Sequence, residues 1–334
     1  MAKRLRCIHA GVHRRGEKML RGFMAQNDRF VPMALVDASG DLAKQQAALA
    51  GVSEQSCFGS LEEAIKAVQA DACVITSPAR FHGQQIALCL NKGLHVFVAK
   101  PMSYDIKESI ALVELAERCN RFLLVDQQQQ FYKTERTLAE WVRDERYGKV
   151  GFCSFVIHRH RPEMAAFTGK DPFIWEQGVH SFNSLVAILG RPAISALAVQ
   201  SKPFWSPYNG ATVSMGVIEF AGGVQCHYLG TFASQSFTME IRVEFERGAA
   251  RIVAEDSWLK KLEFAEPGKG FKPTGIEDDP KESLEAPNLE AFYNGATTGS
   301  RQSNDGRDNL RTLAIADAFI RASETGCKQP VQSF

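Results

Sequence analysis

Short apolar runs alternate with stretches of helical spacing over the first 125 residues. The runs share a length of four residues and a high content of branched aliphatic side chains: Leu5–Ile8, Met33–Val36, Ala72–Ile75, His95–Val98 and Phe122–Val125. Runs without polar alternation are typical of parallel strands that are covered on both faces. Between them apolar residues recur at helical spacing, as at Ile86, Cys89 and Leu90. This alternation predicts an α/β domain with a doubly wound parallel sheet over residues 1–125.

After residue 126 the strand-like runs follow one another directly. They lie at 152–158, 196–200, 212–220, 224–232, 239–245 and 250–253. Several are joined by short turns that contain Gly, which is typical of antiparallel pairing. Helical spacing interrupts them at 182–189, residues 264–287 predict a surface excursion, and a final helix is expected at about 306–323. We therefore predict a second, α+β domain over 126–334 with a mostly antiparallel open sheet.

Composition and charge narrow the class of protein. Hydrophobic residues make up 45% of the chain, charged residues 23%, and the formal net charge is +1. This near balance argues against nucleic acid and membrane surfaces as partners. The eight cysteines include no C-x-x-C pair, so we expect reduced buried thiols, no metal site and a cytoplasmic location.

The turn after the first strand is the expected cofactor end, because a dinucleotide fold binds its ligand there. Aligned on the motif G-x-G-x-x-G, the three glycine positions hold His9, Gly11 and Arg14. The middle glycine is the one at which the backbone approaches the pyrophosphate. His13 and Arg14 can offer positive charge to the phosphates or form a solvated first helical turn; the sequence leaves both readings open.

Two further strand ends add cofactor candidates. Asp37 ends the second apolar run, where a carboxylate can accept the ribose hydroxyls of NAD and would repel the extra phosphate of NADP. Its alternative role is to cap the next helix. Thr76, Ser77 and Pro78 end a neighbouring strand and either line the dinucleotide or form a turn. The sequence thus favours NAD over NADP.

Several segments in this order resemble the glucose-fructose oxidoreductase / inositol dehydrogenase (Gfo/Idh/MocA) family. The resemblance rests on the segments 76–78 with His82, 99–101 (Ala-Lys-Pro), 147–151, 175–180 and 305–306. It implies a Rossmann domain and an α+β domain whose open sheet mediates homodimers or homotetramers, with the final helix packing back on the first domain. It also implies that His82 belongs to the cofactor site, that Lys100 contacts the cofactor and the reacting oxygen, and that His180 removes the hydroxyl proton.

The chemistry of these residues agrees with that implication. Oxidation of a secondary alcohol needs a base for the hydroxyl proton, and a histidine such as His180 suits that task. The ammonium group of Lys100 can stabilise the developing alkoxide. Glu176 lies four residues before His180, on the same helical face if the helix has already begun, and can orient the imidazole. Three departures from the family pattern, His9, Ala99 and Asn183, keep an inactive member as an alternative.

Substrate contacts are expected at the end of the strand that begins the second domain. Because side chains alternate along a strand, either His158 and His160 or Arg159 and Arg161 face the cleft. Arginine suits carboxylate, phosphate or vicinal hydroxyl groups. The alternative for these four residues is a charged strand end that meets solvent. Further candidates are Gln128 and the aromatic ring of Trp175, which can stack on a sugar or pack in the core.

The sequence therefore predicts an NAD-dependent dehydrogenase that acts on a hydroxyl of a sugar, sugar acid, polyol or inositol. Two other functions use the same residues. One is redox-neutral glycoside cleavage, in which NAD oxidises the sugar only transiently. The other is a cofactor-bound sensor without catalysis, which the departures at His9 and Ala99 suggest.

Overall fold

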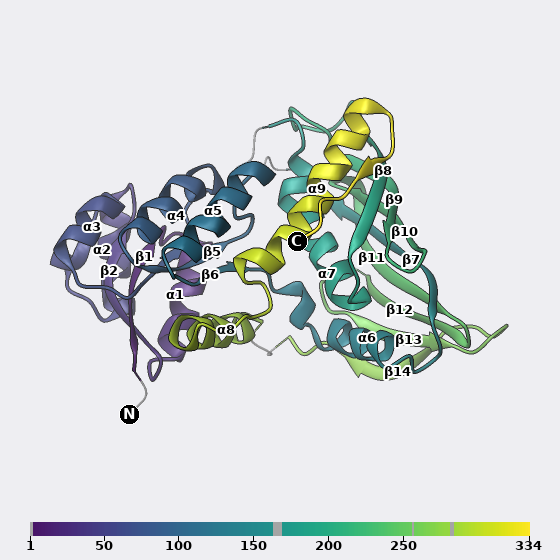
Figure 1. Cartoon of the computed structure of the whole chain (residues 1–334), viewed down its shortest axis with the longest axis horizontal. Coiled ribbons are helices and arrows are strands. Elements are labelled where there is room, and N and C mark those ends of the chain that lie inside the picture. The colour runs from purple at the N-terminus through teal and green to yellow at the C-terminus, as the bar shows by residue number, and fades with distance from the viewer. Residues whose placement is uncertain (1–2, 163–168, 256, 281–283) are drawn as a thin grey trace. The chain divides into compact units, whose positions relative to one another are not determined.

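A computed structural model of the chain describes residues 3–162, 169–255, 257–280 and 284–334 (Figure 1). The chain divides into two compact units. The first comprises Met1–Gln127 and Ser283–Leu310, and the second comprises Gln128–Glu282 and Arg311–Phe334. The sequence analysis placed the boundary at residue 125 and assigned all later residues to the second domain, so segment 283–310 is where the two divisions differ.

The first unit contains a sheet of six strands within the described residues, all paired in parallel. The strands are β1 (Leu5–Ala10), β2 (Phe30–Val36), β3 (Cys57–Phe58), β4 (Ala72–Ile75), β5 (His95–Ala99) and β6 (Leu123–Asp126). Their spatial order is β3-β2-β1-β4-β5-β6, the doubly wound order of a dinucleotide-binding fold. The connecting helices are α1 (Arg15–Ala25), α2 (Gly40–Ala50), α3 (Leu61–Ala67), α4 (His82–Asn91) and α5 (Ile106–Arg118). The predicted Rossmann sheet is confirmed.

Helix α8 (Glu285–Thr298) closes the core of this unit. Its Leu289 and Phe292 are buried in one cluster with Phe23 and Phe97, and the rings of Phe97 and Phe292 lie 5.5 Å apart. The sequence analysis missed this helix because Pro287 and Gly295 weaken its pattern. Gly295 is needed there, since a Cβ atom would lie 2.2 Å from the ring of Phe122.

The second unit contains a sheet of nine strands among the described residues, in the order β14-β13-β12-β11-β7-β10-β9-β8-β15. The strands are β7 (Val150–His160), β8 (Ala193–Ser201), β9 (Val213–Phe220), β10 (Val224–Thr231), β11 (Ala233–Phe245), β12 (Gly248–Glu255), β13 (Lys261–Ala265), β14 (Lys272–Glu277) and β15 (Gln329–Pro330). Neighbours pair antiparallel except β10 with β7. The mostly antiparallel sheet is confirmed, but the predicted surface excursion contains β14 and the start of α8.

Helices cover one face of this sheet and leave the other open. They are α6 (Lys133–Arg143), α7 (Val179–Leu189) and the later part of α9 (Gly306–Thr325), of which residues 306–310 belong to the first unit. The rings of Phe182 on α7, Tyr228 on β10 and Phe319 on α9 meet at 5.0 to 5.5 Å. Within the described ranges, no helix combines the length and the hydropathy that a membrane crossing requires.

Candidate active site

The turn between β1 and α1 is built around two glycines. Gly11 has φ +83°, and a Cβ atom there would lie 2.5 Å from the backbone nitrogen of Ser77. A Cβ atom on Gly16 would lie 1.9 Å from the carbonyl oxygen of Gly11. Gly16 therefore provides the close contact of helix and strand that the third glycine of the motif provides, which corrects the alignment on Arg14. The hydroxyl of Thr76 donates to the carbonyl oxygen of Gly11 and ties β4 to the turn.

His9 points into the core instead of the turn. Its side chain is 2% exposed and its ring meets that of Phe23 edge-on at 5.0 Å. Burial lowers the pKa of this imidazole to about 3, so the ring is neutral. The expectation that His9 binds or crowds the cofactor is therefore corrected. His13 and Arg14 are exposed at the turn and remain candidates, whereas Arg15 is bound to Asp126 and Glu285.

A cavity of about 330 Å³ lies at the carboxyl ends of β1, β2 and β4. The predicted cofactor residues Gly11, Asp37, Ser77 and Pro78 line it, together with Glu62, which was not predicted. The carboxylate of Asp37 accepts hydrogen bonds from the backbone nitrogens of Val12 and Ser39, both at 3.1 Å. These bonds orient Asp37 along the cavity wall. The sequence analysis missed Glu62 because nothing in its motif places the first turn of α3 beside Asp37.

His82 connects two strand ends. It is 1% exposed, and its Nδ1 and Nε2 atoms lie 2.8 Å from the carbonyl oxygens of Pro101 and Ser77, respectively. Burial is the largest cause that lowers its pKa. The imidazole thus joins the loops that follow β4 and β5 and holds the segment that carries Lys100. Its expected contact with the cofactor is replaced by this positioning role. Lys100 itself is partly exposed, directly after β5.

In the second unit, a π-helical turn at Ile174–Gly178 runs directly into α7. The helix has therefore already begun at Glu176, as the predicted pairing of Glu176 with His180 requires. Residues 171–180 are buried except for these two side chains, which are partly exposed. π-helical turns inside α-helices are frequent at functional sites. Asn183 is 3% exposed and its amide donates to Thr312 of α9 at 3.4 Å, so it secures the helix.

The arginines and the histidines at the end of β7, which were alternative substrate contacts in the sequence analysis, have different partners in the structure. Arg159 donates to the side-chain oxygen of Gln177 at 2.9 Å, and Arg161 lies 3.8 Å from the carboxylate of Glu176. Both guanidinium groups lie over the ring of Phe232, at 5.8 and 4.9 Å from its centre. His158 and His160 instead contact Thr238 and the carbonyl oxygen of Ser234. The arginines thus share the side of Glu176, and the histidines face the other side of the sheet.

A buried ion pair supports helices α6 and α7, the second of which carries His180. Lys260 and Glu135 are 0% and 1% exposed at their side chains and bind each other. The hydroxyl of Ser184, one turn after His180 on α7, donates to Glu135 at 2.8 Å. A paired and hydrogen-bonded buried charge of this kind is costly to disturb. It links α6, α7 and the start of β13 into one scaffold.

Comparison with known proteins agrees with this geometry. The family model described as an oxidoreductase family with an NAD-binding Rossmann fold (GFO_IDH_MocA) matches residues 5–127. The match to this family model covers the parallel sheet of the first unit, and relatives named inositol 2-dehydrogenase align with most of the chain. The chain is 24% identical to inositol 2-dehydrogenase 4 of Saccharopolyspora erythraea over 87% of its own length and 86% of the relative. It is 22% identical to inositol 2-dehydrogenase 1 of Paenarthrobacter aurescens over 99% and 97%.

Solved structures show the same fold. WlbA dehydrogenase from Bordetella pertussis, in complex with NADH and UDP-GlcNAcA, superposes with a TM-score of 0.84 at 18% identity and covers 99% of this chain and 100% of that one. At 18% identity, this similarity shows a shared fold and nothing about a shared substrate.

The remaining predicted substrate residues differ in exposure. Trp175 is 5% exposed and packs in the core, so the predicted stacking on a sugar is corrected. Gln128 is partly exposed at the start of the second unit. Besides Phe232, the ring of Trp258 lies beside the arginines, 5.2 Å from the guanidinium of Arg159. Its position between β12 and β13 gave no signal in the sequence. The described residues contain no cluster of His, Cys, Asp and Glu that could hold a metal ion.

Proposed function

We propose that this protein is an NAD-dependent dehydrogenase that transfers a hydride between the nicotinamide and a hydroxyl of a sugar, sugar acid, polyol or inositol. The observation that carries the proposal is the pair Glu176 and His180, partly exposed within an otherwise buried helical segment and flanked by Arg161. A buried segment with two exposed titratable groups is an arrangement for proton transfer.

The residues of the chain have separate tasks in this reaction. When bound, NAD supplies the hydride acceptor. His180 removes the proton of the substrate hydroxyl, and Lys100 stabilises the negative charge that develops on the oxygen. Glu176 holds the imidazole in orientation and is itself held by Arg161. His82 keeps the loop of Lys100 in place through the carbonyl of Pro101.

The cofactor preference follows from charge. Asp37 and Glu62 place two carboxylates on one cavity, where the ribose hydroxyls of NAD can donate hydrogen bonds. A phosphate on the ribose would meet both carboxylates, which disfavours NADP. We therefore propose NAD as the cofactor.

The substrate class follows from Arg159 and Arg161. Both guanidinium groups are oriented by polar partners and lie over an aromatic ring, which suits recognition of hydroxyl pairs or of a carboxylate on a sugar. The relatives named above act on inositol by name, and WlbA was solved with a sugar nucleotide that carries a carboxylate. These names support a carbohydrate-like substrate.

The test is calorimetric titration with NAD and NADP, followed by an absorbance assay for NADH with sugars, sugar acids, polyols and inositols. We expect NAD to bind and a substrate to produce NADH. His180→Ala should then lower kcat about a hundredfold or more while NAD affinity stays unchanged, and Lys100→Ala should also lower kcat. Binding of neither dinucleotide would contradict the proposal, and turnover of glycosides without net NADH would assign the protein to redox-neutral cleavage instead.

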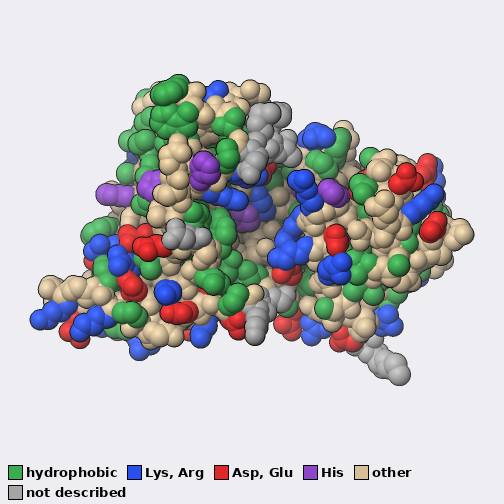
Figure 2. All heavy atoms as spheres, turned by 180° about the vertical axis from the view of Figure 1, so that it is seen from behind, with side chains coloured by type: hydrophobic (Ala, Val, Ile, Leu, Met, Phe, Trp, Pro, Cys, Tyr) green, Lys and Arg blue, Asp and Glu red, His purple; other side chains and the backbone are tan. Residues whose placement is uncertain are grey.

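We also propose that the open face of the nine-stranded sheet joins copies of this chain. Exposed apolar side chains lie on neighbouring strands of that face, among them Leu197 and Val199 on β8 and Met215 on β9, at 45%, 61% and 42% exposure. Hydrophobic side chains with histidines among them are visible on the second unit in Figure 2. Apolar surface of this extent on a sheet is a feature of subunit interfaces.

A further inference from the structure

A second cavity in the first unit lies at the amino ends of the parallel strands, whereas the cofactor candidates follow their carboxyl ends. Its volume is about 620 Å³, within the range of small-molecule sites. His95, which begins β5, and Leu123, which begins β6, line it, whereas Gly11, Asp37 and Lys100 follow the carboxyl ends of their strands. The cavity is therefore a different site from that of the dinucleotide.

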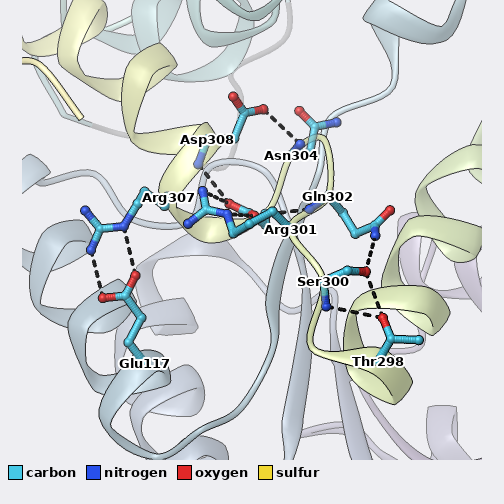
Figure 3. A network of polar contacts seen from close by, with 9 residues as sticks. Glu117, Thr298, Ser300, Arg301, Gln302, Asn304, Arg307 and Asp308 are labelled. Carbon is cyan, nitrogen blue, oxygen red and sulfur yellow. Dashed lines mark hydrogen bonds and ion pairs between the residues drawn. The ribbon is translucent and has the colours of Figure 1, made fainter.

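The charged residues of this cavity leave one positive charge uncompensated. Three arginines and two carboxylates line it: Arg121, Arg301, Arg307, Glu117 and Asp305. Arg307 binds both carboxylate oxygens of Glu117 at 2.8 and 2.7 Å, and Arg301 binds Asp305 with Nε to Oδ2 at 2.6 Å. Within each pair the two charges neutralise each other. Figure 3 shows Arg307 with Glu117 on one side of the group and Thr298 with Ser300 on the other.

Arg121 is the remaining cation. It is partly buried, and its guanidinium donates to the carbonyl oxygens of Gly93 and Asn120, at 2.5 and 2.8 Å. Within the described ranges, no carboxylate is hydrogen-bonded or ion-paired to it. Two carbonyl oxygens fix the orientation of the guanidinium but do not neutralise it. A fixed and partly buried cation without a counter-ion attracts an anion.

Neutral polar groups and an apolar wall complete the cavity. The Nδ1 atom of His95 accepts the backbone N–H of Phe122 at 2.9 Å, so its proton is on Nε2, and burial lowers the pKa of the ring to about 4. The hydroxyls of Thr298 and Ser300 lie 2.8 Å apart. Val113 and Ala116 supply apolar surface. Such a lining suits one oxyanion on a small, hydroxylated and partly apolar body.

We propose that this cavity binds a small metabolite with a single oxyanion group, a carboxylate or a phosphate, on a hydroxylated body, with Arg121 as its anion contact. This binding site is additional to the cofactor and substrate sites and does not depend on the proposed reaction.

The test is calorimetric titration of the full chain with glucose 6-phosphate, glucuronate and glucose. We expect at least one of the two anionic probes to bind and glucose to give no Arg121-dependent binding. Binding of glucose 6-phosphate alone identifies the phosphate, and binding of glucuronate alone identifies the carboxylate. Arg121→Met should weaken that binding about tenfold or more, since a charge-assisted hydrogen bond is lost.

Matched variants separate this site from others. Arg118→Met removes an exposed arginine at the end of α5, three residues before Arg121 and outside the cavity lining, and should leave the affinity unchanged. Arg121→Lys keeps the charge and should lose less affinity than Arg121→Met, and circular dichroism checks that each variant is folded. The proposal is overturned if neither anionic probe binds, if Arg121→Met binds as the unmodified chain does, or if Arg118→Met weakens binding equally.

Discussion

At the scale of the residue, His9 illustrates how burial changes the role of a side chain. The motif alignment placed His9 at the first glycine position of the phosphate turn. In the structure its imidazole is held neutral in the core, because burial lowers its pKa from 6.5 to about 3. The unfolded chain binds a proton below about pH 6.5, and the folded chain does not. The stability that this group contributes is therefore complete above pH 6.5 and is lost as the pH falls towards 3.

We predict that His9→Leu makes stability less sensitive to acid. Between pH 7 and pH 4.5 the free energy of unfolding of the unmodified chain should fall by about 2 to 3 kcal/mol more than that of the variant. Urea titrations of both chains at the two pH values measure this difference. Parallel losses of stability would show that His9 is not held neutral by the fold.

The second prediction at this scale concerns substrate binding. Arg161→Met should raise KM for the substrate about tenfold or more, because a charge-assisted contact is removed, while NAD affinity remains unchanged. His160→Ala is the matched control, since His160 lies on the other side of β7, bound to Ser234. Steady-state kinetics with the substrate found in the absorbance screen provide both values. An unchanged KM in Arg161→Met would remove this arginine from the substrate site.

At the scale of the element, the contact of β1 with α1 depends on Gly16. A methyl group there would lie 1.9 Å from the backbone oxygen of Gly11 and would displace the turn on which the phosphates are expected to bind. We predict that Gly16→Ala weakens NAD binding about tenfold or more with the fold retained. Gly40→Ala is the control, because a Cβ atom at Gly40 meets nothing within 4 Å. Calorimetry compares the two variants, and equal affinities would contradict the role of Gly16.

At the scale of the whole molecule, the open face of the nine-stranded sheet is the proposed contact between copies of the chain. Leu197→Lys combined with Val199→Lys should convert an oligomer to a monomer, because two charges would be buried at the contact. Glu266→Lys, in the exposed turn after β13, is the control. Light scattering of the full chain measures the mass of each variant. A monomeric unmodified chain, or an oligomer that survives the double substitution, would contradict the proposed interface.

The pattern of apolar residues determined the parallel sheet of the first unit and the mostly antiparallel sheet of the second, because side-chain period and run length report local burial. Sequence motifs also singled out Gly11, Asp37, Lys100, Glu176 and His180. Only the tertiary structure showed that α8 packs against Phe97 and that His9 points into the core. It also showed that Gly16 makes the close contact between α1 and the turn after β1. Finally, it placed Arg159 and Arg161, and not the neighbouring histidines, on the side of Glu176. Each of these depends on which distant segments meet, and local periodicity carries no information about such contacts.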